Sequence, residues 1–309
     1  MNAEQYFPEG YLCDTLENKF SLKSRTSLTD AMNENKILEA RTVMCDASHN
    51  LWVDLGCMNG KIPREEGAYG IIEGHVRDIA LITRVNKPVC FMVTGFEQDA
   101  AGAPVAILSR RKPQLLCINN YVGRFIPGDV IPAKITHLEP FGAFADIGCG
   151  LPSLIPIDSI SVSRIANPSD RFTVGCNILA VVKSVEAHGR VCLSHKELLG
   201  SWEENAERFS AGETVTGIIR SVESYGVFVE LTPNLAGLAE PKEGVFPEQS
   251  ASVYIKTIIP ERMKVKLIII GGGEKAATPP PEYFFTGRHM PRWVYSPECS
   301  SRVIESVFE

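Results

Sequence analysis

Residues 138–156 read LEPFGAFADIGCGLPSLIP, and the fold assignment depends on this stretch. Phe141 and Phe144 bracket a Gly-Ala pair, an Ala-Asp-Ile trio follows, and Gly-Cys-Gly at 148–150 is a turn signal. Glycine inside an apolar strand pattern permits the sharp bend that a small barrel needs. The two rings are either core residues of a short hairpin or a surface platform for flat ligands.

The same pattern occurs a second time. Residues 222–240 read VESYGVFVELTPNLAGLAE, and they place Tyr225 and Phe228 84 residues after Phe141 and Phe144. The segments that precede the two copies, GDVIPAKITHLE and GETVTGIIRSVE, also correspond. A repeat of this length indicates tandem small domains.

A third, more divergent copy lies near the N-terminus. Residues 47–63 read ASHNLWVDLGCMNGKIP, in which Trp52 takes the place of Phe144 and His49 that of Phe141. The chain therefore contains three copies of one unit.

Within a copy the pattern is all-β. Apolar and polar residues alternate with a period of two in VIPAKITHL and TVTGIIRSV, as on half-buried strands. FGAFADI and YGVFVEL supply second strands, and NILAVVKSVE and RVCLSHK the last two of the middle copy. Five strands in about 70 residues predict a small Greek-key barrel of the OB type.

The remaining segments divide the chain. KELLGSWEENAERFSAGE has Trp202 and Phe209 near helical spacing, and GGGEKAATPPPE at 271–282 has the composition of a flexible linker. The predicted organisation is an N-terminal extension (1–35), a divergent barrel (36–114), a second barrel (124–198), a connecting helix (199–211), a third barrel (212–270), and a linker with an aromatic tail (271–309).

Composition excludes several classes of protein. The net charge of −6 argues against a simple polycation drawn to nucleic acid, so any such contact must come from local patches or from stacking. Cysteines occur singly and no histidine pair has zinc spacing, so we expect no metal and no cofactor. The start of the chain lacks the features of a signal peptide, and apolar runs are too short to span a bilayer. We expect a soluble, cytoplasmic protein without membrane contact.

No catalytic motif is present. The sequence lacks the phosphate-binding loop, the nucleophile elbow and the zinc-protease helix, and its six histidines are dispersed. We expect no catalytic residues and no enzyme activity.

At this point the residues resemble a known family. GDVIPAKITHLEPFGAFADIG, LPSLIPIDSI and VGCNILAVVKSVEAHGRVCLSHK resemble the RNA-binding domain named for ribosomal protein S-one. The resemblance is strong over 128–196, good over 212–240 and divergent over 36–112. The whole arrangement is similar to short S-one-like proteins of low-GC Gram-positive bacteria.

The resemblance implies an RNA-binding face of strand aromatics, a histidine and a last-strand cation. Matched position by position, the middle copy supplies Phe141, Phe144 and Arg190, the last copy supplies Tyr225, Phe228 and Lys264, and the first copy supplies His49 and Trp52. The family's histidine is replaced by Pro156, Glu240 and Pro63 in the three copies. No copy is intact by the family's standard.

From the residues alone, each ring is more often core than platform. Two aromatics three residues apart lie on opposite sides of a regular strand, so one ring of each pair is expected inside unless the glycine breaks the alternation. The resemblance favours Phe141 and Tyr225 as ligand-facing and leaves Phe144 and Phe228 open. Arg190 and Lys264 are either RNA contacts or solvated cations at strand ends.

Charge counts limit the electrostatic contribution. The middle copy has seven basic and seven acidic residues, the last six and seven, and the first ten and nine. One compact basic cluster consists of Arg110, Arg111 and Lys112. It either contacts phosphates or is the solvated start of a helix. Affinity would come from several weak domains acting together on one strand.

The predicted function is binding of single-stranded RNA, mRNA in particular, in the translation machinery, with the small ribosomal subunit as a partner. The alternatives are a protein-interaction scaffold built from the same barrels, and RNA binding in decay or transcription. The tail, rich in aromatics from Tyr283 to Tyr295, either docks on a protein partner or folds back on the third barrel.

Overall fold

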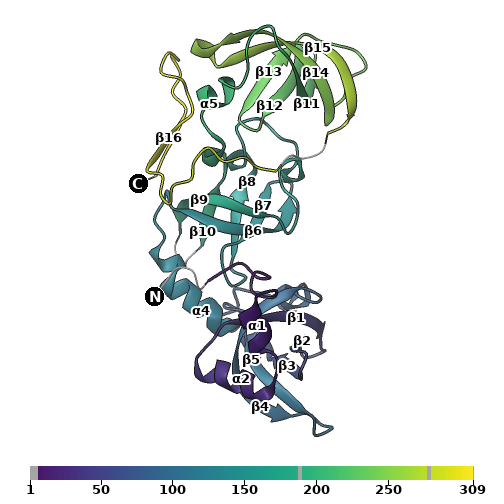
Figure 1. Cartoon of the computed structure of the whole chain (residues 1–309), viewed down its shortest axis with the longest axis vertical. Coiled ribbons are helices and arrows are strands. Elements are labelled where there is room, and N and C mark those ends of the chain that lie inside the picture. Colours follow the sequence, from purple (N-terminus) through teal and green to yellow (C-terminus); the bar gives the residue numbers. More distant parts are fainter. Residues whose placement is uncertain (1–5, 187–189, 277–279, 309) are drawn as a thin grey trace. The chain divides into compact units, whose positions relative to one another are not determined.

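The computed structural model describes residues 6–186, 190–276 and 280–308, which form two compact units. The first unit runs to Arg124 and includes Asp146–Pro152, and the second comprises Phe125–Ala145 and Ser153–Glu309. Three closed five-stranded barrels make up most of the chain (Figure 1). Among the described residues, no helix is long and apolar enough to cross a membrane.

The first barrel is flanked by helices. Its strands are β1 (Leu38–Cys45), β2 (Leu51–Asp54), β3 (Asn59–Ile62), β4 (Pro88–Gln98) and β5 (Pro104–Ser109). The helices are α1 (Leu16–Ser21), α2 (Arg25–Asn33), α3 (Ile79–Ile82) and α4 (Arg111–Asn120). Both N-terminal helices are capped by hydroxyls, since Thr15 accepts from the Asn18 N–H and Ser24 from the Ser27 N–H.

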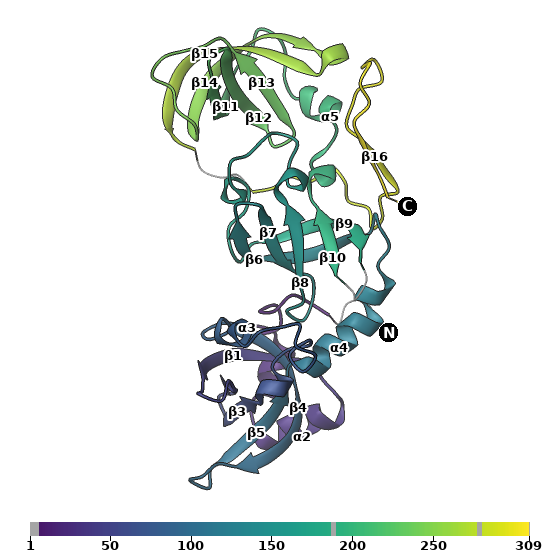
Figure 2. The ribbon, with the colours of Figure 1, turned by 180° about the vertical axis from the view of Figure 1, so that it is seen from behind.

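The other two barrels follow in sequence, as Figure 2 shows from the opposite side. The second barrel contains β6 (Val130–Glu139), β7 (Gly142–Asp146), β8 (Pro152–Pro156), β9 (Asn177–Val185) and β10 (Val191–Ser194). The third contains β11 (Thr214–Glu223), β12 (Gly226–Thr232), β13 (Leu235–Ala239), β14 (Gln249–Ile259) and β15 (Lys264–Lys275). Short 3-10 helices are η2 (Arg64–Glu66), η3 (Val122–Arg124), η4 (Ile157–Ser159), η5 (Pro168–Asp170), η7 (Lys196–Leu199) and η8 (Pro260–Arg262).

The three barrels share one topology. In each, the first strand lies between the second and the fourth, and the third strand pairs in parallel with the fifth. This is the strand order of an OB barrel. The prediction of an all-β chain of tandem five-stranded OB barrels is confirmed.

Alternation along the strands explains the barrel cores. In β15 the side chains of Val265, Leu267 and Ile269 are buried, whereas Lys264, Lys266 and Ile268, which alternate with them, are exposed. Because side chains of a strand point alternately to its two faces, the apolar set fills the barrel and the lysines lie outside.

The connection between the second and third barrels differs in detail from the prediction. Helix α5 spans only Trp202–Ala206, shorter than the predicted 199–211, and Ser201 caps it with a capping box. Trp202 is buried and Phe209 packs beside it against the core of the third barrel, as expected.

The predicted linker is wrong over its first five residues. Strand β15 continues to Lys275, because Gly271 and Gly272 pair with Ser252 and Ala251 of β14. Residues 277–279 of the predicted linker lie outside the described residues. Beyond them, β16 (Arg292–Val294) and β17 (Glu305–Val307) form a two-stranded sheet.

Glu39 of β1 holds the N-terminal segment in the first unit. Its carboxylate accepts backbone N–H bonds from Gly10, Leu12 and Cys13 at 2.8–3.2 Å, and the side chain is buried. Burial raises the pKa of Glu39 from 4.5 to about 7, an effect that the Leu12 and Gly10 N–H groups oppose and the nearby Glu9 charge reinforces.

The first unit is therefore expected to be more stable at pH 5.5 than at pH 8. The pKa of Glu39 is higher in the folded state than in the unfolded state, so its contribution is fully present below about pH 4.5 and is lost as the pH rises through about 7. The full difference is at most about 3 kcal/mol. Amide exchange of β1 at several pH values measures it, and Glu39→Gln should flatten the profile. An unchanged slope in that variant would contradict the assignment.

Candidate nucleic-acid interface

The middle barrel presents both aromatics of the opening stretch on its outer surface. Phe141 lies just before β7 and is 56% exposed, and Phe144 within β7 is half-buried. Their ring centroids are 6.0 Å apart with the planes at 89°. The question left open for Phe144 is thus answered, because its neighbours Ala143 and Ala145 fill the interior and Phe144 points outward.

Phe141 escapes the strand alternation because it precedes the strand. Its carbonyl accepts the Ile157 N–H at 2.9 Å, which ties it to the segment after β8. Gly142 is required at the next position, since a Cβ there would collide with the Ile155 carbonyl. Gly226 is equivalent in the third barrel, where a Cβ would lie 2.6 Å from the Ala239 carbonyl.

A third ring, His137 of β6, joins this pair and was missed from the sequence. Its ring lies 6.3 Å from that of Phe144 at an interplanar angle of 30°, and its Nε2 lies 2.6 Å from a Glu139 oxygen. Alternation along β6 gave no signal for it, because His137 is in phase with the buried Ala133 and Ile135 and yet is exposed near the end of the strand. His137, Phe144 and Phe141 are called the middle platform below.

The third barrel repeats the arrangement. Tyr225 is 65% exposed, Phe228 is half-buried, and their centroids lie 6.2 Å apart with the planes at 87°. Phe228, the second open case, also points outward. The outer platform is the name used below for Tyr225 and Phe228.

Strand register places a lysine in line with the outer platform. Phe228 pairs with Leu238 on β13, and Leu238 pairs with Lys266 on β15. Lys266 is exposed on the same face as Lys264, the residue indicated by the sequence, and lies in the row of Phe228 itself. In the middle barrel the corresponding partner of Leu154 is Cys192, and Arg190 is exposed two residues before it.

The family's histidine position is occupied by different chemistry in each copy. Pro156 is half-buried beside Phe141, Glu240 is exposed at the end of β13, and Pro63 precedes η2. None of the three offers the ring N–H donor of an imidazole.

The first barrel has a different face. The Trp52 indole N–H donates to Asp46 at 3.1 Å, and the Lys61 ammonium lies 6.0 Å from the Trp52 ring centroid. His49 sits in the turn with a φ of 61°, and no ring contact joins it to Trp52 among the residues the structure describes. This copy offers one partly engaged ring rather than a pair.

The basic cluster expected to meet phosphate is not a single patch. Arg111 forms an ion pair with Glu73 at 3.0 Å, and Lys112 is exposed at the start of α4. Arg110 is 3% exposed, so its assignment as an RNA contact is wrong. Its neighbours in sequence point elsewhere because α4 begins immediately after it.

Arg110 instead neutralises a buried acid within the first unit. Its Nε and Nη2 donate to the two oxygens of Glu9 at 2.6 and 3.0 Å, and Arg84 approaches Glu9 at 3.4 Å. The Glu9 backbone N–H donates to Asp146 at 2.7 Å. Burial would raise the pKa of Glu9, but Arg110 and Arg84 hold it below its usual value.

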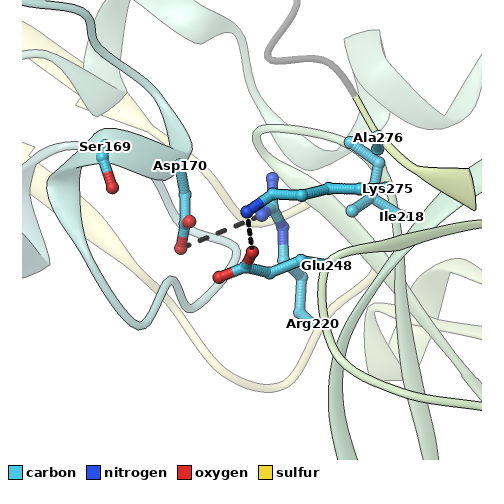
Figure 3. Close-up of a pocket in the computed structure, with 7 residues that line it drawn as sticks. All are labelled: Ser169, Asp170, Ile218, Arg220, Glu248, Lys275 and Ala276. Atoms are coloured by element: carbon cyan, nitrogen blue, oxygen red, sulfur yellow. Dashed lines mark ion pairs between the residues drawn. The ribbon is translucent and has the colours of Figure 1, made fainter.

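One pocket of about 220 Å³ lies in the second unit and is lined by opposite charges (Figure 3). Lys275 pairs with Glu248 at 2.7 Å, and Arg220 approaches Asp170 at 3.9 Å. The cations are already compensated, so the pocket does not resemble a phosphate site.

Comparison with known families agrees with this geometry. The model of the S1 RNA binding domain, named S-one above, matches residues 124–196, which enclose the middle platform. Small ribosomal subunit protein bS1 of Staphylococcus aureus is 27% identical over 268 residues, covering 80% of this chain and 64% of that protein. The same protein of Leuconostoc lactis is 34% identical over 113 residues, 36% of this chain and 26% of its own length.

Among solved structures, a multidomain protein with nucleic acid binding domains from Streptococcus pneumoniae covers 76% of this chain and 73% of its own. It is 11% identical, with a TM-score of 0.25. The chain spans about two thirds or less of the length of the ribosomal relatives, so their whole activity does not transfer to it. The middle barrel thus matches the model of the S1 RNA binding domain, and the chain is similar to small ribosomal subunit protein bS1 over four fifths of its length.

Proposed function

We propose that the chain binds single-stranded RNA by stacking bases on the middle and outer platforms. The observation that carries the proposal is the pair of perpendicular, outward-facing rings, which recurs with nearly the same spacing in two barrels. Stacking on an exposed aromatic contributes about 1–3 kcal/mol per base and tolerates any sequence. Arg190, Lys264 and Lys266 would contact phosphates beside the rings.

Neither the middle nor the last copy has an excess of basic residues, so tight RNA binding requires both platforms to act together. Since the middle and last copies have six or seven basic residues against seven acidic ones, few counterions are released on binding and the salt dependence should be shallow. Two weak platforms on one strand raise affinity through effective concentration. Trp52 of the first barrel would add a third, weaker contact.

We further propose that the bound RNA is mRNA, that the chain works with the small ribosomal subunit in the cytoplasm, and that its role is binding rather than catalysis. The similarity to small ribosomal subunit protein bS1 supports this part. Co-sedimentation with the subunit, with and without ribonuclease, tests it.

Replacing Phe141 and Tyr225 together by alanine is expected to weaken binding of an unstructured RNA about 30-fold or more, because each ring supplies one stacked base. Fluorescence polarisation measures the affinity. Phe246→Ala is the matched control, since Phe246 is an exposed phenylalanine outside both platforms and its loss should leave binding unchanged. Equal affinity for the double variant and the parent protein would refute stacking on these rings.

A protein-interaction scaffold is the second candidate, favoured by the missing histidine in every copy. If no RNA binds the parent protein even at low salt, where electrostatic attraction is strongest, this candidate replaces the first.

A further inference from the structure

The C-terminal tail, residues 283–308, lies along the second unit rather than standing free. In both views its yellow ribbon runs beside α5 and the middle barrel (Figures 1 and 2). Trp293 and Tyr295 are buried, together with Met290 and Phe308. The tail was expected either to dock on a protein partner or to fold back on the third barrel. It folds back, but onto the middle barrel as well as the third, and its buried rings are not exposed to a protein partner.

The first half of the tail binds the middle barrel. The Tyr283 hydroxyl accepts the Leu179 N–H of β9 at 2.9 Å, and its ring meets the buried His195 edge-on at 5.6 Å. Further along, the Val130 N–H donates to Arg288 and the Met290 N–H to Gly128, at 2.9 and 2.8 Å. The two bonds flank an isolated antiparallel bridge between Asp129 and His289, just before β6.

Gly128 makes this approach possible. It has a φ of 94°, and a Cβ there would lie 2.5 Å from the Met290 carbonyl. The glycine that begins the family-like motif GDVIPAK is therefore also a contact of the tail in this chain.

The second half of the tail reaches the third barrel. The Tyr295 hydroxyl donates to the Asn234 carbonyl at 2.7 Å, and the Trp202 N–H donates to the Tyr295 carbonyl at 2.9 Å. The Ser306 hydroxyl donates to the buried Glu197 carboxylate at 2.8 Å. One segment thus holds residues that belong to both barrels.

Its anchor, Asn234, is itself the centre of the joint between the two barrels. The side chain is fully buried, donates to the Lys196 and Gly200 carbonyls at 2.8 and 2.7 Å, and accepts the Val162 N–H at 3.0 Å. Beside it, Glu230 of the third barrel pairs with Arg171, which follows η5 of the middle barrel.

We propose that the tail is an intramolecular clasp that fixes the middle and third barrels as one pre-organised unit, so that both platforms engage a single RNA strand at a set spacing. The second half of this inference rests on the proposed function. A fixed spacing reduces the ordering that binding would otherwise require, and so raises the affinity for RNAs long enough to reach both platforms.

The test uses the full chain with Tyr283→Phe and Tyr295→Phe combined. The change keeps both rings and removes only the hydrogen bonds of the two hydroxyls, to Leu179, His195 and Asn234, and is expected to raise the opening of the tail about tenfold or more. Hydrogen exchange of the Met290 and Trp202 amides, whose backbone acceptors the variant keeps, reports that opening. Val307→Thr is the control, because Val307 is an exposed residue of the same hairpin.

RNA affinity is measured in parallel with two unstructured oligonucleotides, one short enough for a single platform and one long enough for both. The affinity for the long RNA is expected to fall about tenfold in the double variant, while that for the short RNA is unchanged. Exchange that stays as slow as in the parent protein would overturn the clasp. Faster exchange with an unchanged ratio of the two affinities would overturn its role in RNA binding.

Failure of the proposed function gives a different result. In that case neither RNA binds the parent protein, and the part of the inference about RNA falls with it. The exchange data still decide whether the tail holds the two barrels together.

Discussion

Arg110→Met is expected to lower the unfolding free energy of the first unit by about 3–5 kcal/mol, because it leaves the Glu9 carboxylate buried without its main partner. Glu9 is held by two bonds from Arg110 and by a longer contact with Arg84, and its surroundings exclude water. The methionine side chain is similar in length to that of arginine but cannot donate hydrogen bonds to Glu9. The loss of unfolding free energy therefore measures the missing charge compensation rather than a change in side-chain volume.

Hydrogen exchange of peptides from β4 and β5 measures this loss within the first unit. Arg111→Met is the neighbouring control: Arg111 pairs with the more exposed Glu73, and such pairs contribute about 0–1 kcal/mol. If Arg110→Met and Arg111→Met were equally stable, the buried ion pair of Arg110 with Glu9 would not stabilise the first unit as we predict. The RNA affinity of the folded Arg110→Met variant should equal that of the parent protein, whereas it would fall if Arg110 contacted an RNA phosphate.

Glu230→Gln is expected to have an effect of the same size on the second unit, again about 3–5 kcal/mol. Glu230 is 3% exposed and accepts from Arg171 and from both ends of the Arg220 fork, the latter at 2.8 and 3.2 Å. An amide of the same shape cannot balance two buried guanidinium groups.

The repeat supplies a control at the equivalent position of the first barrel. Asp54, two residues after Trp52, is exposed and accepts the Gly56 N–H, so Asp54→Asn should change stability by less than about 0.5 kcal/mol. Hydrogen exchange of peptides from β11 and β12 measures the effect of Glu230→Gln on the second unit, and exchange of peptides from β1 and β2 measures that of Asp54→Asn on the first. Equal effects at the two positions would show that burial of Glu230 does not determine its contribution.

The repeat and its alternating strands were sufficient to predict the barrels, because both are local properties of the sequence. The orientation of Phe141 could not be predicted in this way, because alternation applies only inside a strand and Phe141 precedes β7. The outward orientation of Phe144 became clear only from the burial of Ala143 and Ala145. Their small side chains made this interior position hard to recognise in the sequence.

Errors arose where the outcome depends on distant residues. Arg110 is buried because Glu9 lies against it, 101 positions away in sequence. Lys266 was missed because its place beside Phe228 comes from the register of three strands, which a motif on one strand does not contain. The glycine run after Ile270 was interpreted as a linker from composition, whereas pairing with β14 keeps it in a strand.

The pairing of residues 288–290 with 128–130 also bears on self-association. Backbone N–H and C=O groups left open along a strand are a template for pairing with other chains, and proteins commonly cover such edges. Here the cover is supplied by the far end of the same polypeptide, through bonds at Val130 and Gly128. A protease cut before residue 283 that let the tail depart would leave the Val130 N–H and the Gly128 carbonyl without these partners and would expose the apolar surface under Trp293, so that both become available for contacts with another chain.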